Sequence, residues 1–310
     1  MVSRATFIET VQPIIGRWQQ WRQGLTGDDV FGVVNGALVF VFVVSTLYPF
    51  LYIISVSVSS GAAVTAGRVL LWPVDVTVAA YQQVLADRLF WIAYANTFLY
   101  AIGGTAMSLA LIVPGAYALS RPRLMGRRVL NFLIAFTLWF HAGMIPFFLN
   151  MRDLGLIDSR FGIIIGFACS AFNVILLRNA FEALPAAYEE AAALEGASEF
   201  QLLRHIFIPM TMPAILTVAL LCLVARWNGY FWSMVLLRGQ DKIPVQVYLK
   251  RLIVDARSDD AGAARLAQAD YSFETIIAAI IVVSLVPIVL AYPYLLKHFN
   301  KGMQLGGTKE

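Results

Sequence analysis

Long runs of uncharged residues, separated by short polar segments, dominate this chain. Six runs can be drawn, with apolar centres at 31–57, 89–120, 129–151, 161–177, 206–225 and 275–296. An α-helix needs about 20 residues, within a usual range of about 17–25, to cross the hydrocarbon core of a bilayer. The pattern therefore predicts an all-α polytopic membrane protein with six transmembrane helices, of which the fourth is the shortest. Between the first two spans, 79–86 has the pattern of a short amphipathic helix.

The composition agrees with a membrane protein and excludes a soluble domain. Of the 310 residues, 59% are hydrophobic and 14% are charged, whereas soluble domains carry about 25% charged residues. The net charge of +4 is explained by Lys and Arg in cytoplasmic loops. No basic stretch with interleaved aromatic residues is present, so we expect no nucleic-acid partner.

The orientation follows from arginines between the second and third runs. Arg121, Arg123, Arg127 and Arg128 crowd this loop with no acidic residue among them, and such loops face the cytoplasm. Six crossings then leave both termini cytoplasmic in a bacterial inner membrane, although the long loop 226–270 is also basic. We expect a cytoplasmic segment 1–29, a membrane domain 30–296 and a cytoplasmic tail 297–310. The tail is either a contact with a partner or a solvated end.

The cytoplasmic segment before the fifth run has the signals of two short helices. Pro185 and Gly196 bound a helix over about 186–195, with proline at its start and glycine past its end. Ser198 and Gln201 form a capping-box pair that opens a second helix, which leads through Pro209 into the fifth span. Two helices joined at a glycine predict an angled hook. The alternative is an ordinary amphipathic connection between two spans.

The residues of this hook resemble the EAA signature of permease subunits of binding-protein-dependent ABC importers. The spacing from Glu-Ala-Ala to glycine and to Ile-x-x-Pro matches, with Glu195 where the family often has Asp and Ile208 where it has Leu. The resemblance implies a loop, 178–209, that couples to an ATPase. Small alanines permit close approach and a glutamate can bind an arginine of the partner. The residues implied are Glu190, Ala191, Ala192, Glu195, Gly196, Ala197, Ile206 and Pro209.

Over about 30–300 the chain resembles carbohydrate permeases of the maltose-importer type. Further family-like segments are 96–97, 116–121, 145–146, 154–159, 178–179, 184–185, 227–228 and 244–246. They are closest to the subgroup for oligosaccharides and polysaccharides, including acidic ones such as alginate. The resemblance implies a second homologous permease, two ATP-binding subunits that use ATP and Mg, and an extracytoplasmic solute-binding protein. The chain has no GxxxxGK[ST] phosphate loop, so we expect a non-catalytic subunit without a bound cofactor.

Several polar residues within or beside the spans are candidates for a translocation path. Arg226 is the strongest, because an ionisable residue in a span marks function by default; it departs from the family, which has a neutral residue or His there. Its alternative is snorkelling to the interface. Asn228, Tyr230 and Trp232 either contact sugar or form an aromatic belt. Asn173 either lines the path or bonds a neighbouring helix, and His141 is more typical of a buried, hydrogen-bonded histidine.

Other functions are less consistent with the residues. An ABC importer for a non-sugar solute shares the coupling signature. A stand-alone, ion-coupled carrier needs carboxylates within the membrane, but the six runs are nearly free of Asp and Glu, with Glu274 at one edge. An intramembrane enzyme is disfavoured because GxSxG and HExxH are missing and the three histidines are far apart. For the same reason we expect no metal site.

Overall fold

The computed structural model describes residues 27–140, 142–255 and 270–304, which form helices and turns apart from one bridge between Ser59 and Val76. The first half comprises α2 (Gly27–Ser57), α3 (Gly61–Thr65), α4 (Ala79–Ala86), α5 (Arg88–Phe98), the π-helical segment η1 (Leu99–Gly103), α6 (Gly104–Ser120), α7 (Arg127–Trp139) and α8 (Met144–Asp153). The second half comprises α9 (Arg160–Ile165), α10 (Ala171–Glu182), α11 (Ala187–Leu194), α12 (Glu199–Leu202), the π-helical segment η2 (Leu203–Phe207), α13 (Ile208–Met210), α14 (Met212–Trp227), α15 (Phe231–Leu236), α16 (Val245–Asp255) and α18 (Phe273–Gln304). The helix expected over 79–86 is confirmed as α4.

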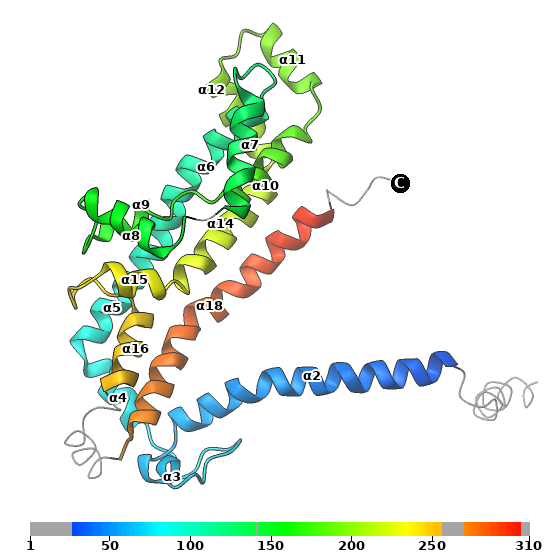
Figure 1. Cartoon of the computed structure of the whole chain (residues 1–310). Coiled ribbons are helices and arrows are strands. Elements are labelled where there is room, and N and C mark those ends of the chain that lie inside the picture. The colour runs from blue at the N-terminus through cyan, green and yellow to red at the C-terminus, as the bar shows by residue number, and fades with distance from the viewer. Residues whose placement is uncertain (1–26, 141, 256–269, 305–310) are drawn as a thin grey trace, which may run out of the picture.

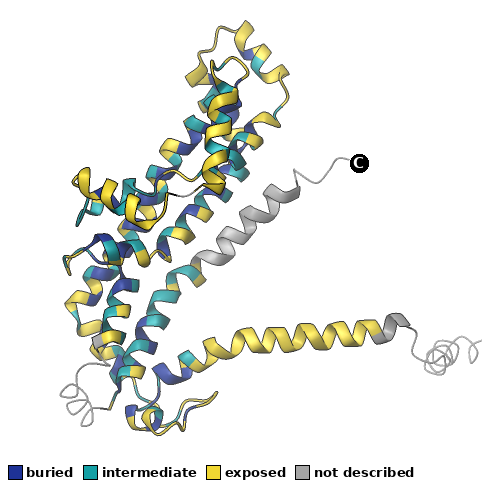
Figure 2. Cartoon of the chain, viewed as in Figure 1, coloured by how far each residue is buried: buried dark blue, intermediate teal, exposed yellow. Residues whose placement is uncertain are grey.

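The molecule is elongated, and its body is built around α6, α10 and α14 (Figure 1). The helices α11 and α12 form one tip, and α3 and α4 lie at the other end. Near α3, α2 contacts α18 and then runs away from the body. Residues 31–52 of α2 are almost entirely exposed (Figure 2). A helix that is apolar all round must be covered by lipid or by another protein.

Three helical stretches of the described residues are long and apolar enough to cross a bilayer: Phe31–Ser57, Arg88–Ser120 and Phe273–Leu290. They coincide with the first, second and sixth runs of the sequence. The second stretch is continuous through α5, η1 and α6, so one long helix joins the two ends of the body. The other three runs contain breaks that the hydrophobic pattern does not indicate.

The breaks in the third and fifth runs are sharp bends. The third run is divided into α7 and α8, which meet at 119° around residue 141, outside the described residues. In the fifth run, the helical stretch Glu199–Met210 meets α14 at 82°. The bend lies at Thr211, whose Oγ1 donates to the Phe207 carbonyl oxygen at 2.7 Å. Residues 206–210 therefore belong to the helical segments before the bend, and α14 begins at Met212, after it.

The fourth run, expected over 161–177, is not one helix but two, α9 and α10, with 166–170 between them outside any helix. Its helical pieces are too short to meet the spanning criterion on their own. Because α9 stops at Ile165, its last carbonyl groups lack the partners that a continuing helix would supply. Arg226 from α14 binds two of them, as described below.

Among the described residues, two of the four apolar clusters border the site described below. The first joins α6, α10, α14 and the loop 187–207, and its centre is the aromatic trio Tyr117, Phe181 and Phe207, with ring centroids 5.2–6.0 Å apart. The second joins η1, α8, α9, α15 and the start of α16. Residues of both clusters, Cys222 of the first and Tyr100 of the second, line one cavity, so the cavity lies between the clusters.

Candidate functional site

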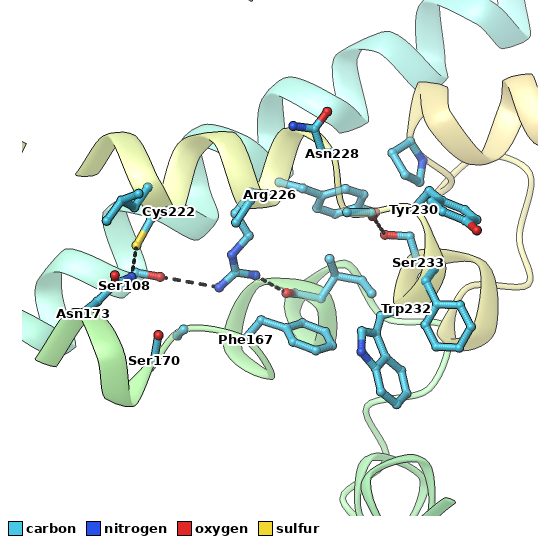
Figure 3. Close-up of a pocket in the computed structure, with 18 of the residues that line it drawn as sticks. Ser108, Phe167, Ser170, Asn173, Cys222, Arg226, Asn228, Tyr230, Trp232 and Ser233 are labelled. Atoms are coloured by element: carbon cyan, nitrogen blue, oxygen red, sulfur yellow. Dashed lines mark hydrogen bonds between the residues drawn. The ribbon is translucent and has the colours of Figure 1, made fainter. Parts of the chain in front are cut away.

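A cavity of about 540 Å³ lies where α14 ends, between the broken fourth run and α15. All the predicted path residues other than His141 line it: Asn173, Arg226, Asn228, Tyr230 and Trp232 (Figure 3). His141 lies outside the described residues. The hydrophobic pattern alone does not place Asn173, on α10, beside residues of α14 and α15; the tertiary structure brings them together.

Arg226 lies in the last turn of α14 and crosses towards α9 and α6. Its Nη1 donates to the Ile163 carbonyl oxygen at 2.7 Å, and its Nη2 donates to the Ile164 carbonyl oxygen at 3.2 Å and to Ser108 Oγ at 3.5 Å. The side chain is half-buried and directed inward. It therefore does not snorkel away from the body, which was the alternative to a position beside the path.

The positive charge of Arg226 is solvated by backbone and not by a carboxylate. Carbonyl groups at the end of a helix carry partial negative charge and favour a cation. Among the described residues, no Asp or Glu lines the cavity, and Arg226 is the only Lys or Arg that does. The cavity is thus apolar over most of its wall, with one uncompensated cation, and such a site attracts an anion.

Gly104 makes room for this guanidinium. A Cβ at position 104 would lie 3.1 Å from Nε and 3.2 Å from Cζ of Arg226. With contacts this short the guanidinium would have to shift by a few tenths of an ångström, so the glycine lets Arg226 lie this close to α6. Neither the periodicity nor the composition indicates this pairing, which joins residues more than a hundred positions apart.

Aromatic rings form the wall beside Arg226. The ring of Trp232 packs against Phe147 and Phe167, with centroids 4.5 and 5.8 Å away. The Arg226 guanidinium lies 5.8 Å from the centroid of Phe167. Tyr230 is exposed. An aromatic face beside a cation is a surface on which a sugar ring and its charged substituent can be held together.

Asn173 contacts a neighbouring helix and also lines the cavity. Its Nδ2 donates to Cys222 Sγ at 3.3 Å, which is a contact between α10 and α14, and its side chain also lines the cavity. Asn228, at the end of α14, donates from Nδ2 to the Val224 carbonyl oxygen at 3.0 Å and is exposed.

Sequence reasoning missed Tyr100, Ser108 and Phe167, which also line the cavity. Tyr100 lies in η1, and its hydroxyl donates to the Lys242 carbonyl oxygen at 2.6 Å. Single π-helical turns inside α-helices often occur at functional sites. The pair Gly103-Gly104 beside this turn was the one local signal that could have drawn attention to it.

A turn over 238–242 follows the C-terminal end of α15, and Asp158 holds it. Asp158 accepts hydrogen bonds from the amides of Arg238 and Gly239, both at 3.0 Å, and from Lys242 Nζ at 2.7 Å. These bonds lower the pKa of the Asp158 carboxyl well below its usual range, chiefly through Lys242. The same turn is bound from α5, because Asn96 Nδ2 donates to the Asp241 carbonyl oxygen at 2.8 Å.

The second candidate site is the two-helix hook over 187–207. Its first helix, α11, ends at Leu194, and Gly196 follows with φ +74°, a left-handed conformation that favours glycine. The capping box of Ser198 and Gln201 is present at the start of α12. The helices expected over about 186–195 and from Ser198 are therefore confirmed.

The residues of the EAA-like segment divide between surface and interior. Glu190, Ala191, Glu195, Gly196 and Ala197 are exposed, and Pro209 is exposed beyond the hook. Ala192 is buried against the first apolar cluster and Ile206 packs against it. A hollow of about 340 Å³ is lined by Ala192, Glu195, Gly196, Ala197, Gln201, Leu202, His205 and Ile206. The hook thus offers a concave surface that combines small residues at 192, 196 and 197 with the polar side chains of Glu195 and Gln201.

Comparisons with known proteins agree with this geometry. The "Polygalacturonan/rhamnogalacturonan transport system permease protein YtcP" of Bacillus subtilis is 32% identical over 90% of this chain and 98% of its own length. A chain in the crystal structure of a bacterial ABC transporter involved in the import of the acidic polysaccharide alginate is 57% identical. That chain superposes with a TM-score of 0.84, with 88% of this chain and 97% of that chain covered.

A chain of a bacterial alginate ABC transporter, in complex with an alginate pentasaccharide-bound periplasmic protein, shares the fold. Its identity is 12% and its TM-score is 0.53, over 97% of this chain and 99% of that one. The family model for the inner membrane component of binding-protein-dependent transport systems matches residues 90–305, which include the cavity and the hook. This chain belongs to the family of inner membrane components of binding-protein-dependent transport systems.

Proposed function

We propose that this chain forms half of the translocation path of an ATP-driven importer for an acidic oligosaccharide or polysaccharide fragment, such as alginate. Support comes from the 57% identical chain of an alginate importer and from the 32% identical permease named for polygalacturonan and rhamnogalacturonan. The observation that carries the acidic class is Arg226, which is the single cation on the cavity wall among the described residues.

The cavity suits a uronate residue for a physical reason. The carboxylate of a uronate can accept a charge-assisted, bidentate hydrogen bond from a guanidinium, and its ring can pack on Trp232 or Phe167. The guanidinium is held by backbone carbonyls, so it is oriented before the sugar arrives. The other polar groups of the wall, hydroxyls and amides such as those of Ser170, Asn173 and Ser233, are neutral, so none of them would bind a carboxylate as strongly as the guanidinium.

The chain needs partners to move its substrate. We propose a second homologous permease that completes the cavity, two ATP-binding subunits that use ATP and Mg, and a solute-binding protein that delivers the sugar. ATP hydrolysis is the task of the partners, because this sequence has no phosphate loop. The hook would dock on an ATP-binding subunit, with the exposed Glu190 and Glu195 positioned to accept hydrogen bonds from basic side chains.

We further propose six crossings, with the hook and both termini in the cytoplasm of a bacterial cell. Each bent pair, α7 with α8 and the stretch 199–210 with α14, would count as one crossing, which gives five with the three straight stretches. The broken fourth run, α9 with α10, would supply the sixth. The loop 121–128 and the hook share one end of the body (Figure 1), and positively charged loops favour the cytoplasmic side. The layout is a segment 1–29, a membrane domain 30–296 with the coupling loop 178–209, and a tail 297–310.

Reconstitution of the complete importer in proteoliposomes tests this function. Wild type should accumulate a uronate oligosaccharide in preference to a neutral oligosaccharide of equal length. Arg226→Gln should lower uptake of the uronate about 10- to 100-fold, since a hydrogen bond to a charged group contributes about 1.5–3 kcal/mol. Arg226→Lys should keep part of the activity.

Lys250→Gln is the matched control. Lys250 is an exposed base in α16 that does not line the cavity, so its loss removes one charge without changing the wall. A similar loss of uptake in Lys250→Gln and Arg226→Gln would mean that overall charge, and not the cavity, selects the substrate. Equal uptake of neutral and acidic sugars by wild type would exclude the acidic class.

A further inference from the structure

The segment that ends α6 holds both helices of the hook by charged contacts. Arg121 Nη1 donates to Glu189 Oε2 of α11 at 2.7 Å, and Arg123 also pairs with Glu189. The Tyr117 hydroxyl donates to Glu199 Oε2 of α12 at 2.6 Å. The short segment 117–123, at the end of α6, therefore binds a helix on each side of Gly196.

The ion pair between Arg121 and Glu189 is largely buried and does not lie on the open surface. The Arg121 side chain is only 10% exposed, and that of Glu189 is 20% exposed. The guanidinium carbon lies 4.9 Å from the ring centroid of Tyr117 and 4.3 Å from that of Phe207. A planar guanidinium can be held between rings and bind a carboxylate at the same time, which an ammonium group cannot do equally well.

The helix before the hook, α10, is also bound to the end of α6, through Arg127. Arg127 Nη2 donates to Glu182 Oε1 at 2.5 Å, and Arg127 Nε donates to the Leu119 carbonyl oxygen at 2.9 Å. Glu182 is the last residue of α10. Three of the four arginines that indicate the orientation of the chain thus bind acidic residues that lie just before or within the hook.

The long helix that carries these contacts also forms part of the cavity wall. The helical stretch Arg88–Ser120 is continuous, with Tyr117 in its last turn and with Tyr100 and Ser108 on the cavity wall. Ser108 contacts Arg226 directly. A displacement of the hook that is transmitted to α6 therefore changes the position of the wall around the guanidinium.

We propose that Arg121 and Tyr117 are positioning residues that make both hook helices move with α6, so that a pull from the ATP-binding partner reaches the Arg226 cavity. In this arrangement Glu189 and Glu199 bind the end of α6 within the chain, whereas Glu190 is exposed and available to the partner. The inference rests on the proposed function. It also explains why the Ala-Tyr-Ala-Leu-Ser-Arg segment, 116–121, ends the second span.

The test uses the importer purified with its partner subunits, reconstituted with the loaded solute-binding protein. ATP hydrolysis and sugar uptake are measured in the same vesicles. Glu189→Gln keeps the shape of the side chain and removes its charge, and Tyr117→Phe keeps the ring and removes the hydroxyl. We expect both variants to assemble and hydrolyse ATP, with sugar moved per ATP lowered about 5- to 20-fold in Glu189→Gln, which lies in the lower part of the range of about 5- to 150-fold typical of coupling between sites.

Tyr117→Phe should lower the same ratio by a smaller factor, because the contact of Arg121 with Glu189 remains. Arg68→Gln is the control, since it breaks an exposed ion pair with Asp75 at the opposite end of the body; its ratio should equal that of wild type. An unchanged ratio in Glu189→Gln and Tyr117→Phe would overturn the inference. A wild-type importer that moves no acidic sugar would instead contradict the proposed function.

Discussion

A single guanidinium shows how this chain places charge inside an apolar body. Arg226 is bound by two carbonyl oxygens at the end of α9 and by the hydroxyl of Ser108. Leaving the charge without an acidic neighbour costs electrostatic free energy, which the oriented carbonyl groups offset. An acidic neighbour would neutralise the cation and remove its attraction for an anionic sugar. The arrangement therefore favours ligand binding over internal pairing.

Gly104 provides a prediction at this scale. Gly104→Val should displace the Arg226 guanidinium, because a Cβ there lies 3.1 Å from Nε, and uptake of a uronate oligosaccharide should fall about tenfold, or ~1.4 kcal/mol. Gly115→Val in the same helix is the control, since nothing lies within 4 Å of a Cβ at that position. Equal uptake by the two variants would show that the contact with Arg226 does not matter.

At the scale of elements, helices of this chain are joined by turns that side chains from distant elements hold in place. The turn 238–242 is bound by Asp158 from one side and by Asn96 and Arg160 from another. Asp158 has φ +53°, a left-handed conformation that Asp and Asn tolerate better than most residues. The turn joins α15, which lines the cavity, to α16.

The hydrogen bonds of Asp158 should stabilise the turn 238–242 equally from about pH 5 to pH 8. The pKa of Asp158 is lowered in the folded protein, so its contribution is complete above the unfolded value of about 3.9 and is lost only as the pH falls towards the lower folded value. Hydrogen exchange of the purified importer should show constant protection factors for the Arg238 and Gly239 amides from about pH 5 to 8.

Asp158→Asn should lower the protection of these two amides throughout that range, because a neutral amide is a weaker acceptor. Asp75→Asn is the matched control. Asp75 also has φ +50° and also binds a basic side chain, that of Arg68, but in another loop. A loss of protection at 238–239 in the control, or none in Asp158→Asn, would contradict the role assigned to Asp158.

At the scale of the whole molecule, the two ends of the body carry different chemistry. One end holds the hook and the arginines that bind it, and the other holds α3 and α4. The apolar helix α2 leaves the body with little of its surface covered (Figure 2). Such a molecule is complete only in a bilayer and beside its partner subunits.

Cysteine labelling in intact cells should establish the orientation. In a Cys169→Ser background, which removes the exposed native thiol, Trp72→Cys should react with a membrane-impermeant maleimide and Met125→Cys should react only after permeabilisation. Both positions are highly exposed, at 81% and 93%. Labelling of Met125→Cys in intact cells would reverse the proposed orientation.

Features that depend on neighbouring residues could be predicted from the amino-acid sequence. The apolar runs, the short helix 79–86 and the two hook helices with the Ser198–Gln201 capping box follow from neighbouring residues, because hydrophobic periodicity and caps act over a few positions. The candidates Asn173, Arg226, Asn228, Tyr230 and Trp232 were found from their polarity or aromatic character in or beside a run. The cavity that these residues share was not predicted from the sequence.

The positions of the helix breaks and the contacts of each polar group could not be predicted in this way, because they depend on the packing of the helices. The break after Ile165 is coupled to Arg226, about sixty residues away, and the role of Gly104 depends on the same side chain. Glu189 and Glu190 are neighbours in sequence, yet one binds Arg121 and the other faces solvent. Such distinctions arise from contacts between distant segments, and these depend on how the helices pack and not on the residues beside them.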